Sequence, residues 1–300
     1  MMKRKLLALA LSALLLPATG TALAQAGKIS GDVVKIAVLT DMSGVYSDLG
    51  GKGSVVAAEM AIEDFKAQFK PKFKIDLVSA DHQNKADVGS NKVREWYDTQ
   101  GVDMVTDVLN SGVALAVAKV TSEKNKIMLN TGAASTRLTN EDCAPNNVVH
   151  YVYDTYALAN GPGKAVTKSG KDTWFFLTAD YAFGQALEKD TADVVKAEGG
   201  KILGSVRHPL NTADFSSFLL QAQASKAKII GLANAGGDVV NAIKGANEFG
   251  ITKNQKLAGL LLFINDVHSL GLGVTQGMQL ASAFYWDMTV ETRKWSRRFF

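Results

Sequence analysis

The stretch VKIAVL at residues 34–39 is apolar apart from Lys35 and has the length of a buried β-strand. After it, apolar residues recur every three or four positions, as they do on one side of an amphipathic helix: Val55, Ala58, Ile62, Phe65 and Phe69. A buried strand followed by such a helix is the repeating unit of a parallel sheet, because the chain needs a crossover to return to the same sheet. This unit predicts an α/β fold.

The same alternation continues along the chain. Further strands are predicted at 74–79, 102–109, 126–129, 173–178, 202–206 and 228–232. Helices are predicted between them at 87–97, 113–123, 185–197, around Phe215 to Ala222, and at 238–249. Strands that alternate with helices of about ten residues or more predict parallel sheets with helices on both faces.

The alternation falls into two units, which predicts two doubly wound lobes joined by a hinge. We expect lobe 1 at 28–152, lobe 2 at 153–285, and a return crossing with the start of a lobe 1 helix at 286–300. The segment YVYD at 151–154 contains neither Gly nor Pro, so we expect an ordered crossing. The last stretch, TRKWSRRFF at 292–300, has the character of a helix without a stop signal. We therefore expect that the C-terminal part of the protein is missing.

The N-terminus has the features of a secretory signal peptide at 1–24. Lys3, Arg4 and Lys5 precede an apolar run at 6–16, and Ala22-Leu23-Ala24 fits a cleavage site. The apolar run is shorter than the about 20 residues that span a bilayer. Cleavage after Ala24 would remove three of the 33 basic residues, leaving 30 against 29 acidic ones and a net charge of +1. We therefore expect export, and neither a nucleic acid nor a lipid surface as a partner.

Catalytic and metal-binding patterns are missing from the sequence. The four histidines, at 82, 150, 208 and 268, are scattered, so we expect no metal and no cofactor. The stretch Gly51-Lys52-Gly53-Ser54 lacks the spacing of a phosphate-binding loop. We therefore expect that the protein is not an enzyme. Cys143 is the single cysteine, for which we expect a buried thiol, the alternative being a partner cysteine beyond residue 300.

The loops that follow the predicted strands share small polar residues and aromatic rings. They are TDMSGVY (40–46), NSG (110–112), NTGAAST (130–136), ADYAFG (179–184) and NAGGD (234–238). Ligands of open α/β sheets bind beyond the carboxyl ends of the strands. We therefore expect a small-molecule site built by these loops.

Taken in order, these loops resemble the leucine/isoleucine/valine-binding family of periplasmic solute-binding proteins of ABC transporters, with the type I fold. The matching stretches are 39–50, 105–116, 128–139, 180–187, 212–219 and 231–250. The resemblance implies two lobes joined by three crossings, with a ligand in the cleft between them. It also implies location in the periplasm, a monomer, and a membrane permease as the partner.

The resemblance implies a set of ligand-binding residues in lobe 1. In the family, the loops after the third and fourth strands bind a ligand carboxylate through hydroxyl and backbone N–H groups. Asn110, Ser111, Ala133 and Ser135 occupy those positions. The alternative for Ser111 and Ser135 is that they only satisfy turn geometry.

Aromatic and acidic residues complete the expected site. Ser43 and Tyr46 come from the loop after the first strand, and Tyr181 and Phe183 stand where the family has a covering tyrosine. Asp238 matches the acidic partner of an α-ammonium group, although it could instead cap a helix. Tyr46 and Tyr181 could instead lie on the lobe surfaces.

The departures from the family pattern widen the expected range of ligands. Phe183 replaces a tyrosine, and small glycines precede Asp238. We therefore expect either an amino acid or an aromatic or hydrophobic carboxylate. Asp41 and Asp180 are expected to be structural, and His268 is a minor site candidate. The alternative function is that of a ligand-sensing receptor domain on the same fold; an enzyme and a structural envelope protein are further alternatives.

Overall fold

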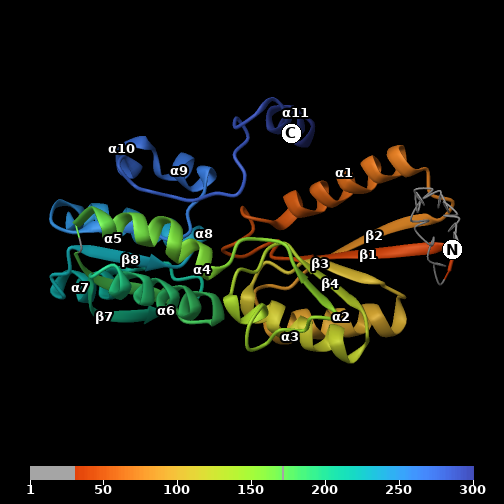
Figure 1. Ribbon diagram of the computed structural model, residues 1–300, viewed down its shortest axis with the longest axis horizontal. Helices are drawn as coiled ribbons and strands as arrows, with labels where there is room; N and C mark the ends of the chain where they lie inside the picture. Colours follow the sequence, from red (N-terminus) through yellow and green to blue (C-terminus); the bar gives the residue numbers. More distant parts are fainter. Residues whose placement is uncertain (1–30, 171) are drawn as a thin grey trace, which may run out of the picture.

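The computed structural model describes residues 31–170 and 172–300, so the signal peptide expected at 1–24 lies outside the described residues. The chain forms two lobes side by side, each with a parallel β-sheet (Figure 1). The two-lobed α/β fold predicted from the sequence is therefore confirmed. No helix in the described part of the chain combines the length and apolar character needed to cross a membrane.

The sheet of lobe 1 has five strands in the order β2-β1-β3-β4-β5, and every pair is parallel. The strands are β1 (Val33–Thr40), β2 (Lys74–Asp81), β3 (Met104–Asp107), β4 (Ile127–Asn130) and β5 (Val148–His150). The first four were predicted, whereas β5 was missed, since three residues are too few to show a period.

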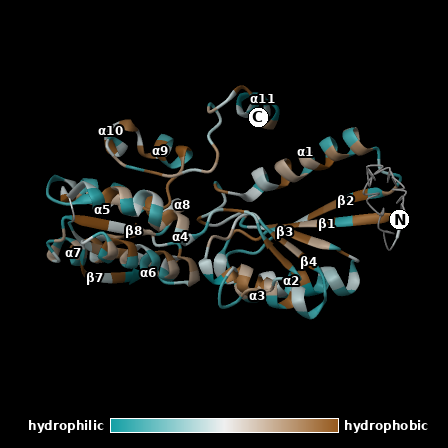
Figure 2. Cartoon of the chain, in the orientation of Figure 1, coloured by the Kyte–Doolittle hydropathy of each residue, from teal (hydrophilic) through white to brown (hydrophobic). Residues whose placement is uncertain are grey.

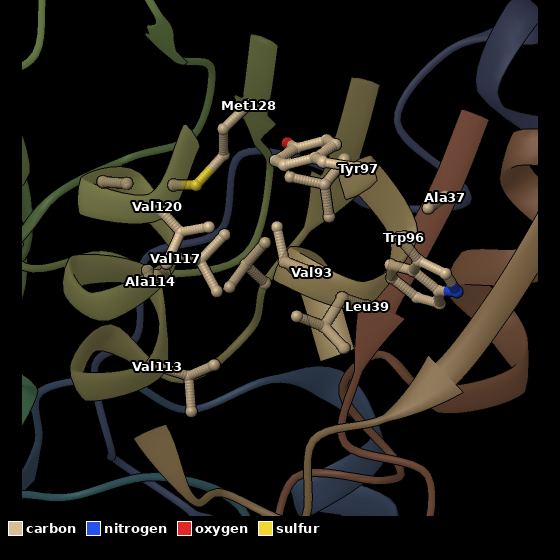
Figure 3. Close-up of a cluster of buried hydrophobic side chains, with 14 of the residues drawn as sticks. Ala37, Leu39, Val93, Trp96, Tyr97, Val113, Ala114, Val117, Val120 and Met128 are labelled. Atoms are coloured by element: carbon tan, nitrogen blue, oxygen red, sulfur yellow. The ribbon is translucent and has the colours of Figure 1, made fainter. Parts of the chain in front are cut away.

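Helices lie on both faces of this sheet (Figure 1). They are α1 (Gly51–Phe69), α2 (Ala86–Thr99), α3 (Ser111–Glu123) and, from the end of the chain, α11 (Val290–Phe299). Leu39 of the sheet packs with Val93 of α2 and Val117 of α3 in a core of fully buried side chains (Figure 3). This core holds the carboxyl ends of β1 and β3 in place.

The face of the lobe 1 sheet opposite to α2 and α3 is covered by α1 (Figure 1), but less completely than the sequence indicates. The apolar residues expected on one side of α1 include Phe65 and Phe69, which are 38% and 60% exposed. α11 packs against this helix, where Arg298 lies 2.7 Å from Asp64. The helix expected from residue 292 thus begins at Val290, with Thr289 as its N-cap.

The sheet of lobe 2 has four parallel strands in the order β7-β6-β8-β9. They are β6 (Thr173–Ala179), β7 (Lys201–His208), β8 (Ile229–Ala233) and β9 (Lys256–Gly259), of which β9 was not predicted. Strands buried on both faces read as continuous apolar runs, as TWFFLTA of β6 does and as the brown colour along β8 shows (Figure 2). Phe176 therefore packs with Leu187 of α6, while Leu177 of the same strand packs with Leu219 of α7.

The helices of lobe 2 were predicted in part. Those expected are α6 (Ala182–Ala197), α7 (Ser216–Ala224) and α8 (Gly236–Glu248). Those missed are α4 (Thr155–Leu158), α5 (Lys164–Gly170), α9 (Ile264–Leu270) and α10 (Leu272–Thr275). A π-helical segment with Pro162, Ala159–Gly163, joins α4 to α5, and its Gly and Pro residues hide the helix from a sequence pattern.

The expectation of a buried Cys143 was wrong, because this thiol is exposed. It lies in a turn after β4, next to Asp142, whose carboxylate pairs with Arg137 at 2.7 Å. The charged neighbours keep the turn at the surface.

Candidate functional site

The carboxyl ends of the strands of both lobes meet around a cavity of about 450 Å³. Small-molecule sites have volumes of roughly 300–1,000 Å³ and mostly apolar walls. The lining residues come from lobe 1 (Tyr46, Leu49, Ser54, Ala57, Ala58, Thr106, Asp107, Leu109, Ser111, Thr131, Gly132, Ala134), the crossing (Val152, Tyr153) and lobe 2 (Tyr181, Phe183, Ala235, Leu261, Phe263). The cavity can therefore change shape when the lobes move relative to each other.

Two tyrosines join the lobes at this cavity. The hydroxyl of Tyr46, on the loop after β1, lies 2.8 Å from the hydroxyl of Tyr181, the residue that precedes α6. Burial raises the pKa of both phenols, so both stay neutral and can share one hydrogen bond. The ring of Phe183 lies 6.1 Å from that of Tyr181 and extends the aromatic wall of lobe 2.

Two further hydrogen bonds join the lobes beside the tyrosines. The N–H of Gly237 donates to the carbonyl of Val45 at 3.0 Å, and the side chain of Asn265 donates to the carbonyl of Asp48 at 3.2 Å. Gly236 has a φ of 59°, and a Cβ atom there would collide with the carbonyl of Val45. Glycine at this position therefore permits the close approach of the two lobes.

Asp41 holds the loop that carries Tyr46. Its buried carboxylate accepts hydrogen bonds from the backbone N–H groups of Gly44 at 2.7 Å and of Tyr46 at 2.9 Å. The side chain of Asn84 donates to the same carboxylate. Asp41 is therefore structural, and Asp180, which accepts from Gln185 and Arg207, lies outside the cavity lining.

Ser111 lies at the first turn of α3 and faces the cavity. Its hydroxyl oxygen accepts the backbone N–H of Ser135 at 3.2 Å. A serine hydroxyl that accepts one hydrogen bond still has a proton to donate. Ser111 can therefore donate to an acceptor, such as a carboxylate, inside the cavity.

Of the residues expected in the site, the cavity brings together Tyr46, Ser111, Tyr181 and Phe183. The others lie outside its lining and use their polar groups locally. The side chain of Asn110 caps α3, the N–H of Ala133 donates to Asn130, and the hydroxyl of Ser135 accepts the N–H of Arg137. The hydroxyl of Ser43 donates to Asp81 at 2.6 Å. His268 is also absent from the lining.

Asp238 neither caps its own helix nor lines the cavity, so the cap hypothesis was wrong. It is the third residue of α8, whose N-cap is Ala235. Its carboxylate accepts the N–H groups of Thr212 at 2.9 Å and Asn211 at 3.1 Å. Burial raises the pKa of this carboxyl to about 6. Asp238 thus anchors the loop after β7.

Asp107 is the main cavity residue that the sequence did not indicate. It lies at the end of β3 and is 5% exposed. Asp107 and Val108 have φ angles of 74° and 54°, a left-handed conformation that is uncommon outside glycine. The strand predicted at 102–109 would place Asp107 in the interior of a strand, whereas β3 ends at Asp107. The only sign available was an acidic residue within an apolar strand.

Asp107 carries the one carboxyl of the cavity lining, and the carboxylates of Asp238 and Asp41 lie near enough to act on Tyr46. The lining contains no Lys, Arg or His side chain. In residues 31–170 and 172–300, no group of three or more His, Cys, Asp or Glu side chains is placed to hold a metal ion. The arrangement suits a small molecule held by hydrogen bonds and ring contacts.

A family model described as "periplasmic binding protein" matches residues 33–300 of the chain. The chain is similar to a periplasmic binding protein from Burkholderia mallei, with 59% identity and a TM-score of 0.87. The match covers 90% of this chain and 71% of the other. The comparison with curated proteins found no match.

Two other solved structures are similar. One is a branched-chain amino acid ABC transporter periplasmic ligand-binding protein from Burkholderia xenovorans, with 41% identity and a TM-score of 0.73 over 89% of this chain and 71% of the other. The second is an ABC transporter solute-binding protein from R. palustris in complex with 4-hydroxybenzoate. It has 21% identity and a TM-score of 0.79, over 89% of this chain and 73% of the other, and shows the shared fold.

Proposed function

The chain belongs to the periplasmic binding protein family, and we propose that it captures a small solute between its two lobes and delivers it to the permease of an ABC transporter. The observation that carries this proposal is the cavity, which is lined by both lobes and by the crossing between them. A solute in this cavity would contact both lobes at once.

The proposed ligand is an amino acid or an aromatic or hydrophobic carboxylate. Leu49, Leu109 and Phe183 provide an apolar wall, and Ser111 provides a hydroxyl donor for a carboxylate. The Burkholderia xenovorans relative is a branched-chain amino acid transporter component, and the R. palustris neighbour holds 4-hydroxybenzoate. These two ligand classes agree with the mixed apolar and polar lining.

Binding proceeds by hinge closure. The lobes, 28–152 and 153–285, move as units, and residues 286–300 return to lobe 1. A solute docks first on one lobe, and the other lobe then closes over it. Closure is favoured by contacts that exist only in the closed state, and the cross-lobe hydrogen bond of Tyr46 and Tyr181 is such a contact.

The protein acts in the periplasm as a monomer after its signal peptide at 1–24 is removed. It makes and breaks no covalent bonds, and it uses no metal or cofactor. The permease recognises the closed arrangement of the lobes. Membership of the periplasmic binding protein family supports the location in the periplasm.

A thermal-shift panel on the full mature protein tests the proposal. The panel contains branched-chain amino acids, aromatic amino acids and aromatic carboxylates. A ligand at a hundred times its dissociation constant stabilises a protein by about 2.7 kcal/mol, which corresponds to a rise in Tm of roughly 5–10 °C for a chain of this size. A protein whose Tm responds to no compound is not a solute-binding protein for these classes, and the proposal fails.

A further inference from the structure

One carboxylate oxygen in the cavity wall has no partner. Burial raises the pKa of the Asp107 carboxyl, and hydrogen bonding from the neighbouring hydroxyls of Thr40 and Ser54 opposes this shift. The hydroxyl of Thr40 in turn accepts the N–H of Gly51 at 3.2 Å, which fixes its orientation. The second oxygen of Asp107, Oδ2, is buried without a hydrogen bond. The site therefore has an unused acceptor next to the cavity.

Gly132 brings the loop after β4 close to this carboxyl. A Cβ atom at residue 132 would lie 2.8 Å from Oδ1 of Asp107 and 2.8 Å from Cα of Leu109. Glycine thus leaves room beside Asp107, and Gly132 and Asp107 both line the cavity. The backbone around Asp107 is the left-handed segment described above, so the fold maintains an unfavourable conformation at this position.

An unpartnered buried carboxylate oxygen is costly. Leaving a buried polar group without a hydrogen bond destabilises the protein, and more so when the group is charged. No basic side chain lines the cavity to offset the charge. A donor carried by the ligand would remove this cost.

We propose that Asp107 binds a protonated amine of the ligand, which makes it a specificity-determining residue for amino compounds. This inference rests on the proposed function. An ammonium group offers the buried oxygen of Asp107 a charged donor and favours the ionised carboxylate, whereas a carboxylate ligand without an amine offers no such donor. The charge of the site therefore favours the amino compound over its deaminated analogue.

The acidic residue that the family resemblance assigns to this task is already engaged. Asp238 of lobe 2 accepts two backbone N–H groups and does not line the cavity. Asp107 provides the acidic group from lobe 1 instead, and Ser54 lines the cavity on the same lobe. The amine is thus bound on the lobe 1 wall, and lobe 2 contributes its aromatic rings, Tyr181 and Phe183.

Matched ligand pairs test this contact. Each pair differs only by the amine: L-leucine with 4-methylpentanoate, and L-phenylalanine with 3-phenylpropanoate. Isothermal titration calorimetry on the full mature protein measures Kd for both members, with wild type and with Asp107→Asn. Asn has nearly the same shape and tolerates positive φ, so the variant removes mainly the charge.

We expect the wild type to prefer the amino member of a pair. Removing one partner of a buried charge pair costs about 2 kcal/mol or more, so Asp107→Asn weakens binding of the amino member by about 30-fold or more, while binding of its deaminated analogue stays the same or improves. The control is Asp180→Asn, which changes the carboxylate of the residue that follows β6, outside the cavity lining. It leaves both Kd values unchanged, and the Tm of each free variant checks that it is folded.

The outcomes separate the two proposals. If the wild type binds the deaminated member at least as tightly as the amino member, the Asp107 contact is wrong and the proposed function stands. Equal losses for both members in Asp107→Asn also contradict the contact, because a structural defect affects both ligands alike. A wild type that binds neither member of any pair contradicts the contact and the proposed function together.

Discussion

The hydroxyl oxygens of Tyr46 and Tyr181 lie 2.8 Å apart, so one hydrogen bond joins the loop after β1 in lobe 1 to the start of α6 in lobe 2. Tyr46 is 3% exposed and the tyrosine rings are 6.4 Å apart. The bond is part-buried at the wall of the cavity, where water competes with it less than at the surface. Opening of the lobes would break it.

The two tyrosines are predicted to be coupled in ligand binding. Tyr46→Phe and Tyr181→Phe each remove the cross-lobe hydrogen bond and weaken the closed state. A double-mutant cycle on the binding free energy should give a coupling of about 0.5–1.5 kcal/mol, the net contribution of one hydrogen bond. Calorimetric Kd values for the four proteins provide the measurement.

Tyr97→Phe is the matched control for this cycle. The hydroxyl of Tyr97 bonds to Thr121 at 3.2 Å within lobe 1, away from the cleft. This variant should lower the Tm without changing Kd. Strictly additive effects of the Tyr46 and Tyr181 changes would show that the bond has no role in closure.

Ser111→Ala is predicted to weaken binding of carboxylate ligands by about tenfold, since one hydrogen bond to a charged group contributes about 1.5 kcal/mol or more. Ser122→Ala, which changes an exposed serine of the same helix, should leave Kd unchanged. Thermal shifts at a series of ligand concentrations measure both. Equal affinities for Ser111→Ala and wild type would exclude Ser111 from ligand contact.

Gly236→Ala is predicted to hinder closure. The new Cβ atom would collide with the carbonyl of Val45 across the cleft, so the lobes cannot approach fully and Kd should rise by about tenfold or more. Gly250→Ala is the matched control, because Gly250 has a similar φ of 65° and its Cβ would contact only the side chain of Lys253, at 3.7 Å. Both variants suffer the same backbone strain. If Gly236→Ala and Gly250→Ala raise Kd by the same factor, backbone strain and not hindered closure explains the loss of affinity.

The carboxyl of Asp238 is predicted to make stability depend on pH. Burial raises its pKa from 3.8 to about 6, so the folded protein holds this proton more tightly than the unfolded chain does. Its contribution to the free energy of unfolding is full below pH 4 and falls as the pH rises to about 6. Relative to Asp238→Asn, the wild type should lose about 1–3 kcal/mol between pH 4 and pH 7.

Urea unfolding of both proteins across this range measures the difference. The comparison with the variant cancels the opposite dependence of His82, whose pKa burial lowers to about 4. A difference between the two proteins that stays constant with pH would refute the role of this carboxyl.

Much of the fold is predictable because the strands at the centre of each sheet are strongly apolar. The second half of β1 and nearly all of β6 are buried, so each strand appears in the sequence as an apolar run. The edge strands β5 and β9 have three and four residues, which is too short for a period. The segment from Thr155 to Gly170 contains Gly161 and Pro162, which indicate a loop, yet tertiary packing holds it helical.

The candidate site is predictable only where strand-end loops determine it. Tyr46 and Tyr181 follow directly from their places after β1 and β6. Asp107 could not be identified in the same way, because the turn of the backbone into the left-handed region at Asp107 and Val108 has no glycine to mark it. The role of Asp238 depends on Asn211 and Thr212, more than 25 residues earlier, and such a contact leaves no local pattern.

Small-angle X-ray scattering of the full mature protein, with and without its tightest ligand from the thermal-shift panel, tests the enclosure of a solute by two moving lobes. Saturating ligand should lower the radius of gyration of the wild type, and Gly236→Ala should show a smaller decrease at saturation. A ligand that binds fully while the scattering curve stays unchanged would contradict closure of the lobes around the solute.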